Sequence, residues 1–427
     1  MSLDESFERA RREKEKQLYG AGVSQLAVIE REYGYAEIRI FPSVDAVIAS
    51  SVLHSILRGK GIYTWIVASP LPPDVVREPT ILVGFEASIA VSGEFRAPSI
   101  VIARGDKPQG LTRAAIVAAR DASLTGLALG MMSEVVVTGD RGLLGLAMAY
   151  WLGLDRDQRG DFIGPEKWLA ELLEVENRAV ATLTVKLFDW FEKPVEEAIV
   201  YTIDPYYPGL TGSMETVKKF LEADEATSKM LGRSVAEAEE ESISRLAERL
   251  YEHLRSTSKA PRRPTEVIGV ARYTKRLPVA DLRKLSNVIA AWIDARGILA
   301  TMPLASSLDT LLNVMDALYY KMFDDTVESI ERGIRTPSLI DRREYGPIRV
   351  CIHRGVDGDA AYPLVAKQLR LLGLYTDCMP GVDRGTSIEV LLDPVVDDVK
   401  HERIREAIRR GCLRYIDGTL YAEARPC

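Results

Sequence analysis

The sequence IRIFPSVDAVIASSVLHSIL, residues 38–57, decides the fold. It opens with the β-prone residues Ile38 and Ile40, continues through a loop of small residues, and ends in apolar residues at helical spacing. The stretch therefore predicts a strand, a loop and a helix in succession. Further β-prone runs between helical patterns predict strands at residues 36–41, 63–67, 81–85, 100–102 and 135–137. This alternation is typical of an α/β domain with a mostly parallel sheet, in which the loops after the strands meet at one edge.

The loops after three of these strands carry few polar residues. The first is Ser-Val-Asp-Ala-Val-Ile at 43–48, the second is Gly-Phe-Glu-Ala-Ser at 84–88, and the third is Ala-Arg-Gly at 103–105. In their order these segments resemble the metal-binding motifs of the RecJ-like DHH phosphoesterases, where the loops contain H-x-D-x-D-G, D-L-G-S and Asp-His-His. The chain resembles most closely the archaeal branch of that family, which is related to the eukaryotic replication factor cell division control protein 45.

Three later segments are similar to the same branch. Residues 201–212 match a D-P-x-x-P-G-L-x-G segment, residues 282–297 match the helix that opens the DHH-associated domain, and residues 348–354 match a V-x-V-S-x-R strand. Where active relatives hold substrate phosphate with Gly-Gly-Gly-His, this chain has Leu-Gly-Leu-Tyr-Thr-Asp at 372–377. The resemblance implies a DHH-type α/β domain at 1–195, a connector with acidic helices at 196–263, and a smaller C-terminal α/β domain at 264–427.

The resemblance also implies that the metal site has been lost. The former motif positions are occupied by Ser43, Asp45, Val47, Phe85, Ala103, Arg104 and Gly105. A pair of divalent cations needs several carboxylate or imidazole ligands, and the loss of even one outer partner costs about 10-fold to 100-fold in metal affinity. We therefore expect no metal, no cofactor and no catalytic residue, and we expect the chain not to be an enzyme.

Several alternatives stay open at this stage. Asp45 either caps the helix that follows it or binds one ion weakly, and Arg104 is a candidate partner for Asp45 or Glu86. A fourth metal ligand of the family could be matched by Glu134 or Asp140. The alternative function is a manganese-dependent single-strand-specific 5′ exonuclease with atypical ligands. A third is a nucleotide or nucleic-acid sensor that binds in the former cleft without hydrolysis.

Composition limits the remaining function classes. The 427-residue chain has a net charge of −7, so it has no general basic field to attract nucleic acid. The cysteines, Cys351, Cys378, Cys412 and Cys427, lack C-x-x-C spacing, which favours buried thiols over a zinc ribbon or a disulfide scaffold. A charged N-terminus and no long apolar run predict a cytoplasmic, nucleoid-associated protein without a membrane contact.

Helix and hinge signals complete the organisation of the chain. Helices are expected at 4–19, ended by Gly20-Ala21-Gly22, and at 113–122, 168–176 and 178–191. Residues 214–256 are nearly all helix-forming, and 259–264 supply a hinge. Two further helices are expected at 279–296 and 307–332.

A local basic stretch follows the hinge and is the candidate nucleic-acid site. Grooves that bind single strands combine cations with stacking aromatic rings. The predicted set is Arg262, Arg263, Arg272, Tyr273, Lys275, Arg276 and Arg354. A solvated surface is the alternative interpretation of these cations. The family resemblance further implies a role as a non-catalytic replication factor, bound to the GINS complex and through it to the MCM helicase, with a contact to single-stranded DNA.

Overall fold

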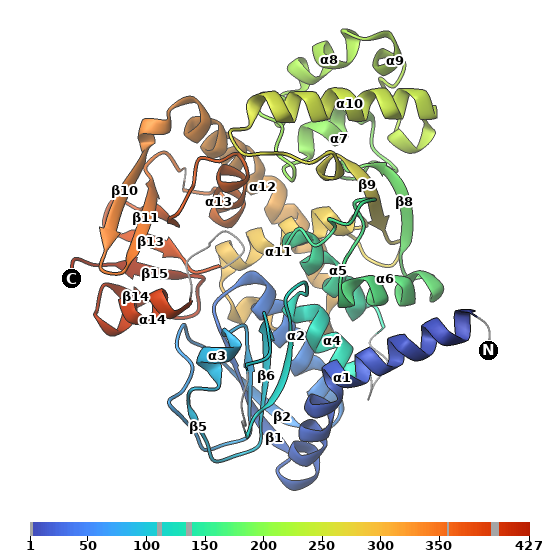
Figure 1. The fold of residues 1–427 in the computed structure, drawn as a ribbon. Coiled ribbons are helices and arrows are strands. Elements are labelled where there is room, and N and C mark those ends of the chain that lie inside the picture. Colours follow the sequence, from blue (N-terminus) through green and yellow to red (C-terminus); the bar gives the residue numbers. More distant parts are fainter. Residues whose placement is uncertain (1–2, 109–112, 134–138, 357, 394–400) are drawn as a thin grey trace.

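The computed structural model describes residues 3–108, 113–133, 139–356, 358–393 and 401–427 (Figure 1). Its first sheet is parallel, with strand order β2-β1-β4-β6-β7. The strands are β1 Tyr35–Ile40, β2 Tyr63–Ala68, β4 Thr80–Val83, β6 Ser99–Arg104 and β7 Ala115–Ala119. The predicted parallel α/β sheet is therefore confirmed. The strand expected at 135–137 lies outside the described residues.

Both faces of this sheet are buried, as a parallel sheet requires. Ile81 and Val83 belong to the largest apolar cluster, whereas Leu82 between them belongs to a second cluster on the opposite face. The first face packs against α2 and α4, and α1 contacts β6 and β7. The helices and short strands of this region are α1 Leu3–Glu32, α2 Val44–Gly59, β3 Val75–Val76, α3 Ala87–Ala90, β5 Glu94–Phe95, α4 Leu124–Ser133, α5 Arg141–Trp151 and α6 Pro165–Val175.

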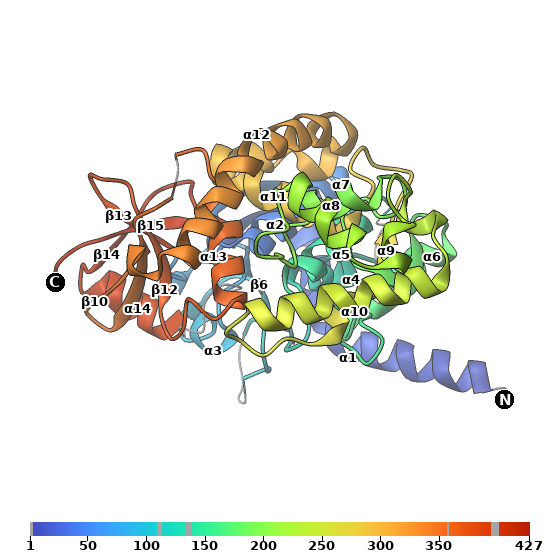
Figure 2. The same cartoon turned by 90° about the horizontal axis from the view of Figure 1, so that it is seen from above.

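A helical region with a core of its own follows. Strands β8 (Val180–Val185) and β9 (Ile268–Tyr273) pair antiparallel, and the helices of this region lie between these two strands in the sequence. A third apolar cluster joins the two strands to the helices, which lie at the top of Figure 1 and at the right of Figure 2. The helices are α7 Val195–Tyr201, α8 Met214–Glu222, α9 Glu225–Ser228 and α10 Glu240–Thr257, with 3-10 turns at Val235–Glu237 and Pro264–Glu266.

The C-terminal part is built on a mixed sheet of order β10-β11-β12-β13-β15-β14. Helices α11 and α12 lead into it and contact each other and α13. The elements are α11 Leu282–Arg296, α12 Leu308–Arg335, β10 Ile340–Tyr345, β11 Ile348–His353, α13 Tyr362–Leu371, β12 Met379–Asp383, β13 Ile388–Leu391, α14 His401–Arg409, β14 Leu413–Tyr415 and β15 Tyr421–Ala424. Three 3-10 turns span Leu299–Thr301, Leu304–Ser306 and Pro337–Leu339.

Three helix predictions were wrong. Residues 113–122 contain strand β7 and residues 178–191 contain strand β8, because both segments pair with neighbouring strands that the local sequence does not reveal. Helix α1 does not end at Gly20 but continues to Glu32. A Cβ atom at Gly22 would lie 2.7 Å from Met131 and 2.7 Å from Val117, so this glycine permits close packing instead of ending the helix.

The prediction for the cysteines was also wrong. Cys351 is bonded to Cys378, and Cys412 is bonded to Cys427. The two pairs are 27 and 15 residues apart in sequence, and the sheet brings each pair together. No helix among the described residues is long and apolar enough to span a membrane.

Candidate functional site

The residues at the expected motif positions meet at the carboxyl edge of the first sheet. Strand β4 lies between β1 and β6, with Ile40 opposite Val83 and Val83 opposite Ile102. The loops after these strands therefore leave the sheet at the same level. The structure places Ser43, Phe85 and Ala103 at this edge, and the Gly105 amide beside them donates to the Ala119 carbonyl at 3.0 Å.

Asp45 is buried at this edge and caps a helix other than the predicted one. Ser43 caps α2, the helix that contains Asp45, by accepting the Ala46 amide at 3.4 Å. The Asp45 carboxylate instead accepts the Leu124 amide at 2.7 Å, the Thr125 amide at 3.0 Å and the Thr125 hydroxyl at 2.8 Å. It thus caps α4, and the prediction that it caps the helix after it was wrong. Burial raises the pKa of Asp45, against the lowering effect of Arg104 and these hydrogen bonds.

A second buried carboxyl group beside Asp45 was missed by the sequence analysis. Glu166, in α6, accepts the Ser123 amide at 2.5 Å and the Ser123 hydroxyl at 2.8 Å. Burial is the main cause that raises its pKa to about 8; the hydrogen bonds from Ser123 oppose the rise, and the charge of Asp45 adds to it. Glu166 comes from a helix rather than from a strand end, so no strand-loop pattern pointed to it.

Residues from the C-terminal part cover the edge. The Asp393 carboxylate accepts the Val44 amide at 3.1 Å, at the start of α2. The His401 ring stacks on Phe41 with 4.3 Å between centroids, and its Nδ1 accepts the Glu86 amide at 3.0 Å. Burial is the main cause that lowers the pKa of His401 to about 4, with a further contribution from the charge of Arg104, so the ring is neutral at pH 7 and can accept this hydrogen bond.

Apolar packing fills the space between the two sheets at this edge. One continuous cluster contains Phe85 and Ala103 of the first sheet region together with residues of the C-terminal sheet and α14. The C-terminal members include Val350, Met379, Val390, Leu392, Ile404 and Ala407. Val47 is fully buried as well, in the largest cluster. Apolar side chains of the C-terminal part therefore cover this edge of the first sheet.

The other candidate ligands have different partners. Asp140 forms an ion pair with Arg178 at 2.5 Å, and Glu86 accepts the Ser88 hydroxyl at 2.7 Å. Glu134 lies outside the described residues. Within the described part of the chain, Arg104 makes no ion pair with Asp45 or Glu86, and no group of three or more His, Cys, Asp or Glu side chains could hold a metal ion. The positive charge of Arg104 lowers the pKa of Asp45 electrostatically, without an ion pair between the two side chains.

The predicted nucleic-acid residues do not form one groove. Arg272 is 4% exposed and is held by Asp161 at 2.6 Å and Glu174 at 2.8 Å. Arg262 is buried and paired with Glu266 at 2.6 Å. Arg354 lies on the C-terminal sheet and pairs with Asp341 at 2.7 Å. Arg262 and Arg272 are therefore held in buried ion pairs, and Arg354 belongs to the C-terminal sheet region, whereas Tyr273 belongs to β9.

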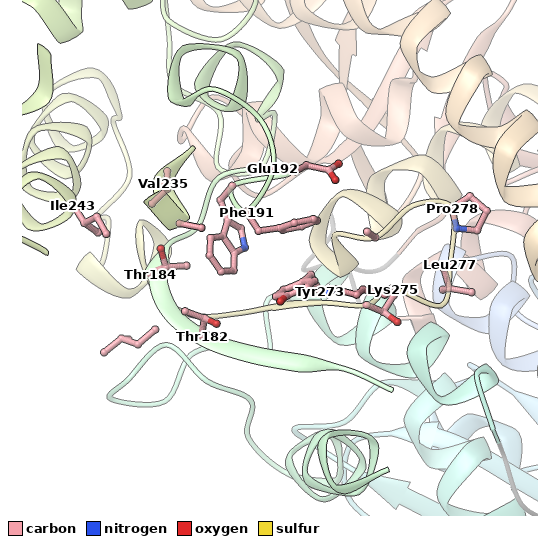
Figure 3. A pocket seen from close by; sticks show the side chains of 15 residues that line it. Thr182, Thr184, Phe191, Glu192, Val235, Ile243, Tyr273, Lys275, Leu277 and Pro278 are labelled. Carbon is pink, nitrogen blue, oxygen red and sulfur yellow. The ribbon is translucent and has the colours of Figure 1, made fainter. Parts of the chain in front are cut away.

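Tyr273 and Lys275 do line an open groove of about 750 Å³. Tyr273 stacks on Phe191 with 4.4 Å between ring centroids, and Trp190 packs edge-on against both rings. Figure 3 shows Thr182 and Thr184 of β8 along one side, Val235 and Ile243 at one end, and Lys275 and Pro278 at the other. Lys275 is accompanied by Glu192 in the lining, so the groove is aromatic but not strongly basic. Arg276 is exposed nearby, with its Nε 3.4 Å from the Asn177 carbonyl oxygen.

The fold and the covered edge define a two-sheet α/β protein of the type predicted from the sequence. No family model and no curated protein matches the chain. Among solved structures it is similar to CDC45 from Entamoeba histolytica, with a TM-score of 0.59 and 10% sequence identity over 96% of this chain and 94% of that one. The predicted fold class is thus confirmed, and the fold is the one seen in that CDC45.

Weaker similarities connect the chain to RecJ. The structure of RecJ in complex with Mn²⁺ from Thermus thermophilus gives a TM-score of 0.42 at 11% identity, over 96% of this chain and 52% of that one. A structure of exonuclease RecJ bound to manganese gives 0.34 at 11% identity, over 96% and 90% of the two chains.

Proposed function

We propose that this chain is a non-catalytic DNA replication factor of the DHH phosphoesterase superfamily, a scaffold or accessory subunit of the archaeal replicative helicase assembly. The observation that carries the proposal is the covered carboxyl edge of the first sheet. Asp393 and His401 of the C-terminal part bond to the loops at this edge, and Phe85 and Ala103 belong to the apolar cluster around it.

This arrangement favours a scaffold over a hydrolase on physical grounds. Phosphoester cleavage with two metal ions needs open, anionic coordination positions close to the substrate. Here Asp45 is committed to the amides of α4, and its neighbours are apolar. An ion at this edge would have to break the cap and enter an apolar cluster, at a large desolvation cost.

The partner assignment rests on resemblance and on fold. The sequence motifs are similar to those of the archaeal branch, and the fold is shared with a CDC45. We propose GINS as the direct partner and MCM as the partner reached through GINS. The contact with single-stranded DNA is assigned to the groove of Tyr273 and Lys275, since a base can stack on an aromatic ring without sequence preference.

Affinity purification from native cells under mild salt, with nuclease treatment and mass spectrometry, tests the partner assignment. Recovery of GINS and MCM subunits after nuclease treatment supports the scaffold. Their absence, together with Mn²⁺-dependent release of nucleotides from a single-stranded 5′ end by the pure protein, would favour the alternative exonuclease. If an Asp45 variant is used to test the exonuclease, its nuclease activity must be compared with that of the wild type per folded molecule. Asp45 caps α4, so its replacement also destabilises the fold.

The DNA contact has its own test. Replacing Tyr273 by Ala and Lys275 by Gln should weaken binding of a labelled single strand about 10-fold, since a stacked base contributes about 1–3 kcal/mol. Tyr63→Ala is the matched control, because Tyr63 is 70% exposed and lies outside the groove. Equal losses in both variants would remove the groove from the proposed function.

A further inference from the structure

A second cavity lies away from the covered edge, between the end of α5, the hinge segment and helices α11 and α13. Its volume is about 350 Å³. Its lining contains the cationic residues Arg156, Arg262, Arg263, Arg283, Lys367 and Arg370. The acidic residues of the lining are Asp155, Asp204 and Glu266. Positive side chains therefore outnumber negative ones around this partly open cavity, in a protein whose net charge is −7, although Arg156 pairs with Asp121 outside the lining.

The buried ion pairs behind this lining are incomplete. Asp155 is shared, since Lys186 lies 2.5 Å and Arg283 3.4 Å from the same carboxylate oxygen. The other buried carboxylate, Asp204, forms an ion pair with Lys367, with 2.7 Å between Oδ2 and Nζ. Three buried cations thus face two carboxylates. Asp161, which also acts on Lys186, is engaged by Arg272 at 2.6 Å.

Arg283 has unused hydrogen-bond donors. It is 9% exposed, and its Nε and Nη1 are buried without a hydrogen-bond partner among the described residues. Arg262 Nε is also buried without a hydrogen-bond partner among the described residues. Arg272, by contrast, uses its Nε and Nη1 on two carboxylates. The guanidinium of Arg283 therefore has more donors than acceptors around it, and its positive charge is only partly compensated.

We propose that this cavity binds a phosphate-bearing anion of the size of a nucleoside monophosphate. A phosphate group carries the negative charge that the buried cations lack, and its oxygens match the forked donors of arginine. The volume is about ten times the share of one water molecule in the liquid, so a sugar or base fits beside the phosphate. Arg263 lies at the exposed side of the lining, where it meets an entering anion first. The site goes beyond the proposed scaffold role and does not depend on it.

Thermal unfolding and titration calorimetry with AMP and with inorganic phosphate test the site on the full chain. The salt control is NaCl at equal ionic strength. AMP at saturating concentration should raise Tm by about 2 °C or more over that control and bind at one site per chain. No heat and no rise with either probe would overturn the proposal. Equal affinity for the two probes would overturn the nucleotide assignment, because the extra volume would then contribute nothing.

Substitution of Arg283, whose Nε and Nη1 have no hydrogen-bond partner in the described part of the chain, gives the sharpest result. Arg283→Met should leave Tm without ligand unchanged or higher, since Lys186 still pairs with Asp155, and should abolish the response to AMP. Arg263→Gln, an exposed change that does not threaten folding, should weaken AMP binding about 10-fold. Arg343→Gln, on the C-terminal sheet, is the matched surface control. An unchanged AMP response in both cavity variants would show that the stabilisation comes from general salt exclusion and would overturn the site.

Discussion

Asp45 caps helix α4, which begins about 80 residues later in the sequence. Its carboxylate accepts two amides and one hydroxyl at the start of α4. Asp45→Ala leaves those buried amides without acceptors, so we expect a loss of about 3 kcal/mol in the free energy of unfolding, measured by urea denaturation.

Asp309→Ala is the control for that change. Asp309 is an exposed aspartate in the first turn of α12, and its loss should cost no more than about 0.5 kcal/mol. If the two variants were equally stable, Asp45 would be free to serve as a ligand, and the exonuclease alternative would gain support.

Glu166 makes stability depend on pH in the neutral range. Its folded pKa is about 8, above the usual 4.5, so the protonated form contributes stability that is full below pH 4.5 and is lost as pH rises through 8. Glu166→Gln keeps a neutral group of the same shape. Between pH 5 and pH 8 the wild type should therefore lose about 3 kcal/mol relative to this variant, as measured by urea denaturation at each pH. Parallel pH profiles would mean that Glu166 is ionised in the folded protein.

The apolar character of the expected motif positions could be predicted from the sequence, but the contacts around them could not. Val47, Phe85 and Ala103 stand at fixed places after strands, so their apolar character was visible in the order of the motifs. Glu166 and His401 come from distant helices, and no spacing relates them to the edge. Tertiary packing alone brings them there.

Helix α14 docks on the first sheet through a neutral histidine. The pKa of His401 is about 4 in the folded protein, below the usual 6.5, because burial disfavours the charged ring. The unfolded chain binds the extra proton between these values, so the contribution of His401 is full above pH 6.5 and is lost as pH falls toward 4.

We expect the wild type to lose about 2 kcal/mol between pH 7 and pH 4.5 relative to His401→Gln, whose side-chain oxygen can still accept the Glu86 amide. Paired urea titrations at the two pH values measure this difference. A constant difference between the proteins would mean that the ring is solvated and that α14 does not seal the edge.

The elements that were predicted wrongly share a cause. Strand β7 is rich in alanine, which favours helix locally, but pairing with β6 along Ile100–Arg104 decides its conformation. Strand β8 reads Val-Ala-Thr-Leu-Thr-Val, with the β-branched residues typical of a strand, but its strand partner, β9, lies some ninety residues later in the chain. Strong periodicity over a long segment predicted α2, α11 and α12 well, because these helices bury a face whatever their neighbours are.

The three predicted domains are connected by their cores. The largest apolar cluster runs from Ile38 in β1 through Leu285 in α11 to Leu369 in α13, and the second joins Leu82 to Val350. The order of motifs predicted two α/β units with a connector, but it could not show that the cleft between the units is filled. Whether a cleft is open depends on side chains that meet from opposite ends of the chain.

Shared clusters make the unfolding of the whole molecule cooperative. We expect a single thermal transition with coincident midpoints by calorimetry and by tryptophan fluorescence. Phe41→Ala removes the ring on which His401 stacks and should lower stability by about 3–5 kcal/mol, with the first sheet region melting ahead of the C-terminal sheet. Leu183→Ser, at a 67% exposed position, is the control and should keep one transition. Two separate transitions in the wild type would mean that the C-terminal part moves independently, that the edge of the first sheet opens, and that the scaffold proposal loses its main support.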